Sequence, residues 1–360
     1  MSCIIHVPYP DPFRCPLNVA DEECGDAVIS FIEDYIFRRL VGGDDVAAIF
    51  IEPILGEGGY IVPPKNFIPQ LHKLCKEYGI LLVIDEVQTG FGRTGKWFAI
   101  EHWGVDADLI VMAKGIASGL PLGAIVGKSN VMSLPKGSHA STFGGNPVAL
   151  AASRAVIEVI KEEGLLENAT RVGEFILKRV SEWVNNYEIV GHVRGKGLMI
   201  GIELVKDKRT KEYAVKELNK ILIEAFKKGL AVIGAGFSTI RISPPLVISE
   251  ELASKGLDIL ILTEELKLIW GHEKLPYMEP KGEWYKFDVK ISVDVTERNL
   301  EFLKRIFKKK DYSEIFIALG NNLREAVSGI EKISKAKITY IQGSFGLRAK
   351  LLKNWLNKLK

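Results

Sequence analysis

Short apolar runs that alternate with a helical pattern are the feature that most constrains the fold of this chain. The runs begin at Val46, Gly79, Ala107 and Gly123. Between the first two, residues 66–79 place apolar side chains at helical spacing, and the pattern ends at a glycine. Strands separated by helices usually pair in parallel and are covered on both faces. The sequence therefore predicts an α/β fold built on a doubly wound, parallel-rich sheet.

The pattern changes further along the chain, which predicts several domains. Asn146 and Pro147 favour the start of a long helix. Strand patterns around a further helix follow, and after residue 262 a Pro- and Gly-rich stretch precedes a strand–helix–strand–helix pattern. We expect a partial large domain over residues 1–145, connecting helices over 146–187, a small α+β domain over 188–262 and an additional α/β segment over 263–360.

Composition and charge exclude several classes of protein. Hydrophobic residues make up 47% of the chain and charged residues 26%, and no apolar run approaches the ~18 residues that span a bilayer. No signal peptide is visible at the N-terminus, so we expect a cytoplasmic protein without membrane contacts. Residues 263–360 hold 20 Lys and Arg against 13 Asp and Glu, a net charge of +7. A solvated surface explains such a charge more often than nucleic-acid binding, which we do not expect.

The four cysteines favour reduced thiols. Cys3, Cys15, Cys24 and Cys75 show no CxxC spacing. Free thiols are the usual state in the cytoplasm. A zinc site that joins His6 to the first three cysteines is the alternative.

An acid and a lysine follow two of the predicted strands. Asp85 ends the strand in "LLVIDEVQTGFGRTG", and Lys114 ends the strand in "ADLIVMAKG". Such an acid can simply mark the return to solvent, but ligands of open α/β sheets bind at these strand ends. A lysine amine can form a Schiff base, and pyridoxal phosphate (PLP) needs both such a lysine and an acid for its pyridine nitrogen. We therefore predict a PLP site at Lys114 and Asp85.

Six motifs extend this prediction to a family. From about Ile5 to Leu262 the chain resembles the class III aminotransferases, fold-type I PLP enzymes that include 4-aminobutyrate, ornithine and acetylornithine aminotransferases. The resemblance implies transfer of an amino group between an ω-amine or amino acid and a 2-oxo acid through a Lys114 aldimine. The motifs, in the family's order, are "EPILGEGG", "DEVQTGFGRTG", "MAKG", "STFGGNP", "VRGKGLMIG" and "IRISPPL".

The resemblance also implies roles for the cofactor-binding residues. Lys114 would hold PLP and move the proton, and Asp85 would pair with the pyridine nitrogen. Val87 would pack on the ring, and Gln88 would bond the phenolic oxygen. Thr142 would bind the phosphate of a PLP in the neighbouring subunit, which implies a dimer. A plain loop hydroxyl is the alternative for Thr142.

Two further residues are implied to recognise substrate. Arg241 would bind a substrate carboxylate, and Glu57 would pair with Arg241 when the substrate carries none there. Such an exchange avoids an unpaired buried guanidinium, which is costly. A permanent structural ion pair is the alternative for these two residues.

The resemblance does not cover the whole length of a family member. The family's N-terminal share, with its phosphate-binding glycine turn and ring-stacking aromatic, has no counterpart in these residues. We expect an open sheet edge and an uncovered apolar face, a homodimer or a complementing N-terminal chain as partner, and little activity from this chain alone.

Two other functions stay open. Some archaeal relatives of the class racemise amino acids with the same lysine and acid, because both reactions share a carbanion. A non-catalytic, dimerising remnant is the third possibility. The substrate and the role of residues 263–360 are not predicted.

Overall fold

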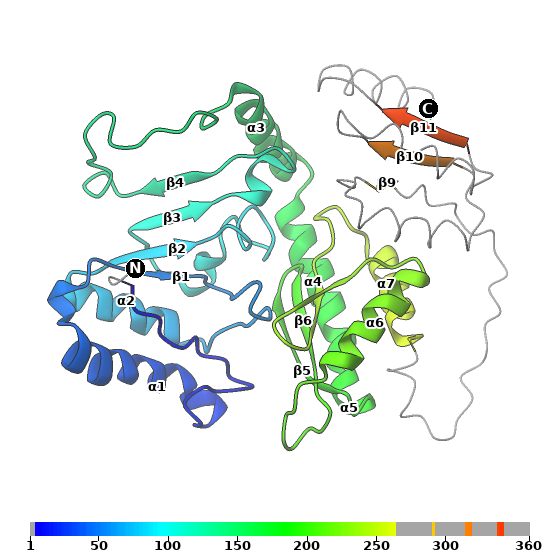
Figure 1. Cartoon of the computed structure of the whole chain (residues 1–360), viewed down its shortest axis with the longest axis horizontal. Helices are drawn as coiled ribbons and strands as arrows, with labels where there is room; N and C mark the ends of the chain where they lie inside the picture. Colours follow the sequence, from blue (N-terminus) through cyan, green and yellow to red (C-terminus); the bar gives the residue numbers. More distant parts are fainter. Residues whose placement is uncertain (1–3, 264–289, 292–313, 319–336, 342–360) are drawn as a thin grey trace, which may run out of the picture. The chain divides into compact units, whose positions relative to one another are not determined.

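A computed structural model describes residues 4–263, 290–291, 314–318 and 337–341 of the chain. The chain divides into two units, Met1–Glu273 and Lys274–Lys360, which are described separately. The first unit contains two sheets, and helices pack against each of them (Figure 1).

The first sheet has the strand order β1-β2-β3-β4. Strands β1 to β3 pair in parallel, as predicted, but β4 pairs antiparallel to β3. The sheet is therefore parallel-rich, as predicted, with one antiparallel edge strand. Residues 113–123 between β3 and β4 contain only a short 3-10 turn, and a parallel return needs a crossover of a dozen residues or more. The strands are β1 (Ala48–Ile51), β2 (Leu81–Asp85), β3 (Leu109–Met112) and β4 (Ala124–Gly127).

Helices cover one face of this sheet. Helix α1 (Cys24–Ser30) continues into a wider, π-type segment (Phe31–Leu40), and α2 (Phe67–Tyr78) lies beside it (Figure 1). One apolar core joins both helices to Leu82 and Ile84 of β2. The apolar spacing of residues 66–79 thus predicted α2 correctly. Short 3-10 turns lie at Asp21–Glu23, Gly43–Asp45, Ala99–Trp103 and Lys114–Ala117.

The opposite face of the same sheet is exposed at its two outer strands, β1 and β4, whereas Val83 of β2 on this face is buried. Phe50 of β1 is 73% exposed and Ile125 of β4 is 55% exposed. Phe50 pairs with Val83, and Ile125 pairs with Val111, which pairs with Asp85. Because side chains alternate along a strand, these residues share one face with Asp85. The exposure of Phe50 and Ile125 agrees with the predicted uncovered apolar face at these two outer strands.

Helix α3 (Pro147–Glu162) begins where the sequence predicts. The Asn146 side chain accepts hydrogen bonds from the amides of Val148 at 2.9 Å and Ala149 at 3.4 Å. The helix packs on the turn that follows β3 through Met112, Ile116 and Ile160. Helices α4 (Leu165–Ser181) and α5 (Trp183–Asn186) continue the chain.

The second sheet has a fully buried central strand. Its order is β5-β6-β8-β7, all antiparallel, and every residue of β6 is buried. Helix α4 supplies Ala169, Val172 and Ile176 to this core. The domain boundary that we expect after residue 187 stays a prediction. The elements are β5 (Val190–Lys196), β6 (Met199–Leu204), α6 (Val215–Lys227), β7 (Ile233–Ala235), β8 (Thr239–Ile242) and α7 (Glu250–Ile261).

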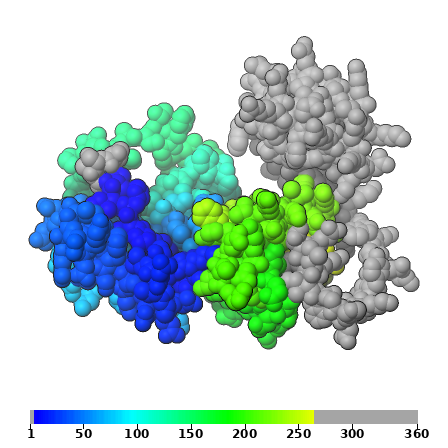
Figure 2. Space-filling model, turned by 60° about the horizontal axis from the view of Figure 1, so that its bottom comes forward, coloured from blue at the N-terminus to red at the C-terminus, as the bar shows by residue number. Residues whose placement is uncertain are grey.

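The N-terminal segment, residues 4–20, contacts both halves of the first unit: the Tyr9 hydroxyl donates to the Glu52 carbonyl after β1 at 3.1 Å, and Phe13 and Arg14 contact the second half. It appears dark blue beside the green surface in Figure 2. Arg14 Nε donates to Glu203 Oε1 at 3.0 Å, and Lys211 Nζ donates to the Phe13 carbonyl at 2.6 Å. The segment therefore ties the two halves of the first unit together.

The cysteines differ from the expectation. Cys15 and Cys24 form a disulfide with their Cα atoms 5.7 Å apart, so the prediction of reduced thiols was wrong for this pair. Spacing along the chain did not show that they meet in space. Cys75 is a buried free thiol, and burial raises its pKa to about 12. Cys3 lies outside the described residues, and no cluster of metal ligands is found within them.

The second unit contains a small parallel sheet. Its strands are β9 (Lys290–Ile291), β10 (Glu314–Ala318) and β11 (Lys337–Ile341), in the order β11-β10-β9. Strands β10 and β11 are the two predicted in this region, and the predicted helices lie outside the described residues. Among the residues that the structure describes, no helix is long and apolar enough to cross a bilayer.

Candidate active site

Asp85 and Lys114 lie at the same end of the first sheet. Asp85 is the last residue of β2 and pairs with Val111 of β3. The Glu86 amide donates to the Val111 carbonyl at 2.8 Å, which keeps the two strands paired to their ends. Lys114 follows two residues after Met112, the end of β3. The acid and the amine thus come from adjacent parallel strands, as the sequence predicts.

The two neighbouring acids after β2 have different surroundings. Glu86 is fully buried and accepts hydrogen bonds from the Thr89 hydroxyl and from the amides of Ala99 and Ile100. Burial raises the pKa of Glu86. Asp85 is half-buried, and its Oδ1 accepts only from the Val87 amide at 2.9 Å. Within residues 4–263 no donor reaches Asp85 Oδ2, so Asp85 is the acid that can meet a ligand.

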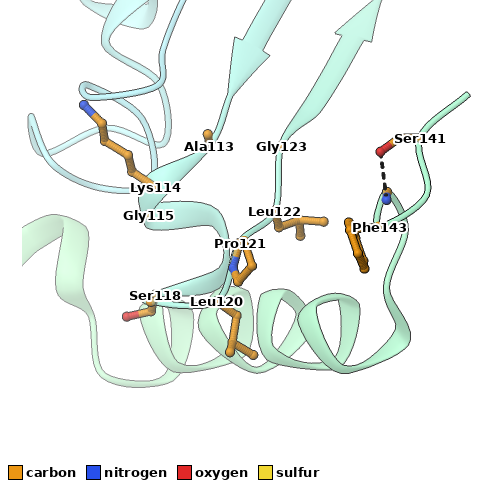
Figure 3. Close-up of a pocket in the computed structure, with 12 residues that line it drawn as sticks. Ala113, Lys114, Gly115, Ser118, Leu120, Pro121, Leu122, Gly123, Ser141 and Phe143 are labelled. Atoms are coloured by element: carbon orange, nitrogen blue, oxygen red, sulfur yellow. Dashed lines mark hydrogen bonds between the residues drawn. The ribbon is translucent and has the colours of Figure 1, made fainter. Parts of the chain in front are cut away.

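Lys114 has an unusual backbone conformation. Its φ is +43°, in the left-handed region that residues other than glycine rarely adopt. Such strain costs about 1–3 kcal/mol and persists where the surrounding structure enforces it, often at functional sites. In Figure 3 its side chain points away from Ser141 and Phe143. The strained turn therefore directs the amine away from that wall of the pocket.

Glu52 is a site residue that the sequence analysis missed. It follows β1 directly, and its Oε2 accepts from the Gly56 amide at 2.9 Å. Burial raises the pKa of Glu52, the Asp85 charge raises it further, and the Lys114 amine lowers it. Glu52 therefore lies within electrostatic range of Asp85 and Lys114. The rule that pointed to Asp85, an acid directly after a buried strand, could have found it.

Gln88, Glu57 and Arg241 form a hydrogen-bonded group within electrostatic range of Lys114. Gln88 Nε2 and Arg241 Nη1 each donate to Glu57 Oε1 at 2.6 Å. These two bonds lower the pKa of Glu57. Gln88 Oε1 is buried and has no partner within the described residues. The side chain of Arg241 is 15% exposed, whereas that of Glu57 is 72% exposed. The acid can therefore leave the pair, while the arginine needs a counter-ion.

An open pocket of about 1040 Å³ is lined by the loop from Ala113 to Gly123 and, on its other side, by Ser141, Phe143 and Gly144 (Figure 3). Thr142 is exposed and does not line this cavity. Val87 is half-buried beside Asp85. Of the predicted site residues, only Lys114 lines this cavity, while hydrogen bonds join Gln88, Glu57 and Arg241, and Thr142 faces solvent.

The arrangement fits the ring of PLP. The ring needs an amine for its aldehyde, an acid for its pyridine nitrogen and a partner for its phenolic oxygen. Lys114, Asp85 and Gln88 offer these groups, and Gln88 carries a buried polar atom that lacks a partner within the described residues. A buried polar atom without a partner is uncommon unless a ligand or water satisfies it.

Comparison with known proteins supports this interpretation. The chain is 46% identical over 261 residues to a leucine/methionine racemase of Thermococcus litoralis, a match that covers 72% of this chain and 59% of the racemase. It is 39% identical over 260 residues to a probable 4-aminobutyrate aminotransferase of Bacillus subtilis, covering 71% and 59%. The chain thus spans less than two thirds of the relatives it matches.

A solved structure shares the fold. An amine transaminase from an uncultivated Pseudomonas species, solved with PLP bound, superposes with a TM-score of 0.66 at 37% identity, covering 71% of this chain and 60% of that one. The profile of the family described as "Aminotransferase class-III" matches residues 1–263. The chain belongs to the class III aminotransferases.

Proposed function

We propose that this chain carries the cofactor-ring and substrate-carboxylate parts of a PLP-dependent transaminase site. The observation that carries the proposal is the meeting of Asp85 and Lys114 at adjacent strand ends, beside a group of polar side chains that includes the unpaired Gln88 oxygen. PLP supplies the electron sink for a substrate carbanion when it is bound.

Each residue then has a defined task. Asp85 keeps a proton on the pyridine nitrogen through its free Oδ2. Lys114 binds the cofactor aldehyde through its amine and carries the proton to and from the substrate Cα. Gln88 Nε2 would donate its second hydrogen to the phenolic oxygen, and its bond to Glu57 fixes its orientation.

Glu57 and Arg241 would let one site accept two kinds of substrate. A substrate carboxylate takes the place of Glu57 on Arg241, and the exposed Glu57 side chain moves into solvent. A substrate without a carboxylate at that position leaves the Glu57–Arg241 pair intact. Either way the half-buried guanidinium keeps a counter-ion, because leaving it unpaired would be costly.

Amino-acid racemisation is a second candidate. The racemase of Thermococcus litoralis is 46% identical to this chain, against 39% for the probable aminotransferase of Bacillus subtilis. Both reactions remove the proton at Cα and differ in where a proton returns. The residues described above serve either reaction.

A partner would complete the site. The exposed Thr142 suits contact with a phosphate held in a second copy of the chain. The uncovered face that bears Phe50 and Ile125 would be covered by the part of the family fold that these 360 residues do not include. Burial of such a face is worth about 25 cal/mol per Å².

The test mixes the chain with PLP and a polypeptide that corresponds to the unmatched part of the Thermococcus litoralis racemase. L-Alanine labelled with deuterium at Cα is then supplied with and without 2-oxoglutarate. Loss of deuterium with conversion of alanine to pyruvate and of 2-oxoglutarate to glutamate supports transamination, and D-alanine formed without acceptor supports racemisation. A Lys114→Ala chain is the control and should give neither. A mixture that binds PLP at Lys114 but never releases deuterium would contradict both functions.

A further inference from the structure

A buried cluster of two arginines and one glutamate lies beside the Glu57–Arg241 pair. Glu203 Oε1 accepts from Arg14 Nε at 3.0 Å, and Glu203 Oε2 accepts from Arg194 Nη2 at 2.6 Å. The Thr239 hydroxyl also donates to Glu203 Oε2 at 2.9 Å. The side chains of Arg194 and Glu203 are 5% and 4% exposed. Charges buried this deeply persist only when they are paired and hydrogen-bonded.

Arg194 reaches beyond this cluster to the turn that carries Glu57. Its Nε and Nη2 donate to the Gly59 carbonyl at 3.1 and 2.6 Å, and its Nε also donates to the Tyr60 carbonyl at 3.2 Å. The fork of the guanidinium thus holds two successive carbonyls of one turn. Glu57 precedes Gly59 by two residues, so Arg194 fixes the backbone from which Glu57 extends.

The packing around this turn leaves little freedom. Gly59 has a φ of +132°, which only glycine adopts easily, and a Cβ there would lie 3.1 Å from Arg194 Nη2. A Cβ at Gly201 of β6 would lie 3.1 Å from the Gly59 carbonyl oxygen. The turn therefore sits directly on the second sheet.

The same turn contacts Arg241 of β8 and the connection that leads from β7 into this strand. The Gly236 amide donates to the Glu57 carbonyl at 2.7 Å, and the Arg241 guanidinium lies 5.6 Å from the centre of the Tyr60 ring. Thr239, which receives a 3.3 Å bond from Arg194 Nη2, precedes Arg241 by two residues on β8 and so shares its face. Arg194 thus contacts the supports of both members of the pair.

We propose that Arg194 is a positioning residue for the Glu57–Arg241 pair. It holds the Gly56–Tyr60 turn against β8, and this sets how tightly Glu57 competes with a substrate carboxylate for Arg241. Arg194 makes no hydrogen bond to either side chain of the pair within the described residues. The consequence for substrate exchange rests on the proposed function, whereas the effect on the pair itself does not.

The first test measures the pKa of Glu57 by NMR in the chain labelled with ¹³C-glutamate, with Glu57→Gln to assign the signal. Arg194→Lys keeps a cation beside Glu203 but offers one nitrogen in place of the fork. We expect the pKa of Glu57, which is lowered in the native chain, to rise toward its ordinary value in this variant. Arg179→Gln, which removes a guanidinium bonded to Ser254 and Asp258 elsewhere in the same domain, should leave it unchanged.

A milder variant guards against failed folding. Thr239→Val removes the hydroxyl that bonds both Arg194 and Glu203 and keeps the shape of the side chain. It should move the pKa of Glu57 in the same direction by a smaller amount. An unchanged pKa in Arg194→Lys, or in Thr239→Val where the lysine variant does not fold, overturns the proposal.

The second test uses propanoate as a carboxylate probe and follows its binding by calorimetry. With Glu57 held less firmly, propanoate should bind Arg194→Lys at least about threefold more tightly than the native chain, which is ~0.6 kcal/mol. Glu57→Gln gives the upper limit of this effect. Equal affinities in the native and lysine chains contradict the proposed positioning role. A shifted pKa of Glu57 without any propanoate binding leaves the positioning role in place and counts against the exchange at Arg241.

Discussion

The two sheets of the first unit differ in how completely they are buried. In the second sheet every residue of β6 is buried, and helices α4, α6 and α7 contribute to its core. In the first sheet one face exposes Phe50 and Ile125, although the other face packs against α1 and α2. Arg241, which we propose to bind a substrate carboxylate, lies in the complete sheet. Asp85 and Lys114, which we propose to bind the cofactor ring, lie at the end of the incomplete one.

This difference indicates which part of the site the chain can form by itself and which part needs further protein. Arg241 and its supporting cluster of Arg194 and Glu203 are held by contacts that the chain itself provides. Asp85 shares its face with the exposed apolar residues. The substrate side should therefore be formed in the isolated chain, while cofactor binding should need further protein.

The largest expected effect is on cofactor affinity. The 360-residue chain alone should be purified mostly without PLP and should show negligible transamination of 4-aminobutyrate, ornithine or alanine. Without the family's phosphate-binding glycine turn, the PLP phosphate lacks two or three charge-assisted hydrogen bonds, each worth about 1.5–3 kcal/mol. Their loss weakens binding by several orders of magnitude. Absorbance spectra and calorimetric titration with PLP measure this. Stoichiometric cofactor and steady turnover in the chain alone would contradict the comparison between the sheets.

The next effect concerns the complete sheet. Glu203→Ala should lower the free energy of unfolding by about 3–5 kcal/mol, because Arg14 and Arg194 lose their buried counter-ion. Glu250→Ala removes an exposed partner of Arg171 and should cost less than ~1 kcal/mol. Urea unfolding compares the two variants. A loss for Glu203→Ala no larger than that of the control would show that the cluster does not stabilise the domain.

A smaller effect is expected from pH. Burial lowers the pKa of His192, which stacks on Phe13, to about 4. The unfolded chain binds a proton at this residue below about pH 6.5, so it binds more protons than the folded chain between those values. The free energy of unfolding that depends on neutral His192 is therefore fully present above about pH 6.5. It falls by ~3 kcal/mol as the pH drops toward 4.

The variant His192→Phe keeps the aromatic stack and should remove this part of the pH dependence. His139→Gln changes an exposed histidine and should leave the dependence as in the native chain. Unfolding curves at several pH values between 4 and 7 provide the measurement. Parallel losses of stability in the native chain and in His192→Phe would argue against the buried site.

Local patterns predicted most of the first sheet and its site. The apolar run that ends at Asp85 and the run before Lys114 have strand character independent of their surroundings, and parallel pairing then brings their ends together. Glu57, Gln88 and Arg241 came from motifs that lie far apart in the chain, and the structure joins them within hydrogen-bond distance.

Other features depend on contacts that no local pattern contains. The antiparallel β4 follows from the short connection after β3, and the disulfide follows from a chain reversal that brings Cys15 to Cys24. Arg194 and Glu203 look like ordinary charged residues in strands until the fold buries both. Whether Thr142 meets a phosphate depends on a partner and stays a prediction.

Trapping of the cofactor tests the central claim most directly. The chain is incubated with millimolar PLP, reduced with borohydride and digested, and the labelled peptides are mapped by mass spectrometry. We expect a visible absorbance band before reduction and a single dominant label on Lys114. Asp85→Asn should weaken the band, and Lys114→Ala should abolish the label. A label scattered over exposed lysines, or unchanged in Lys114→Ala, would contradict a PLP site at the ends of β2 and β3.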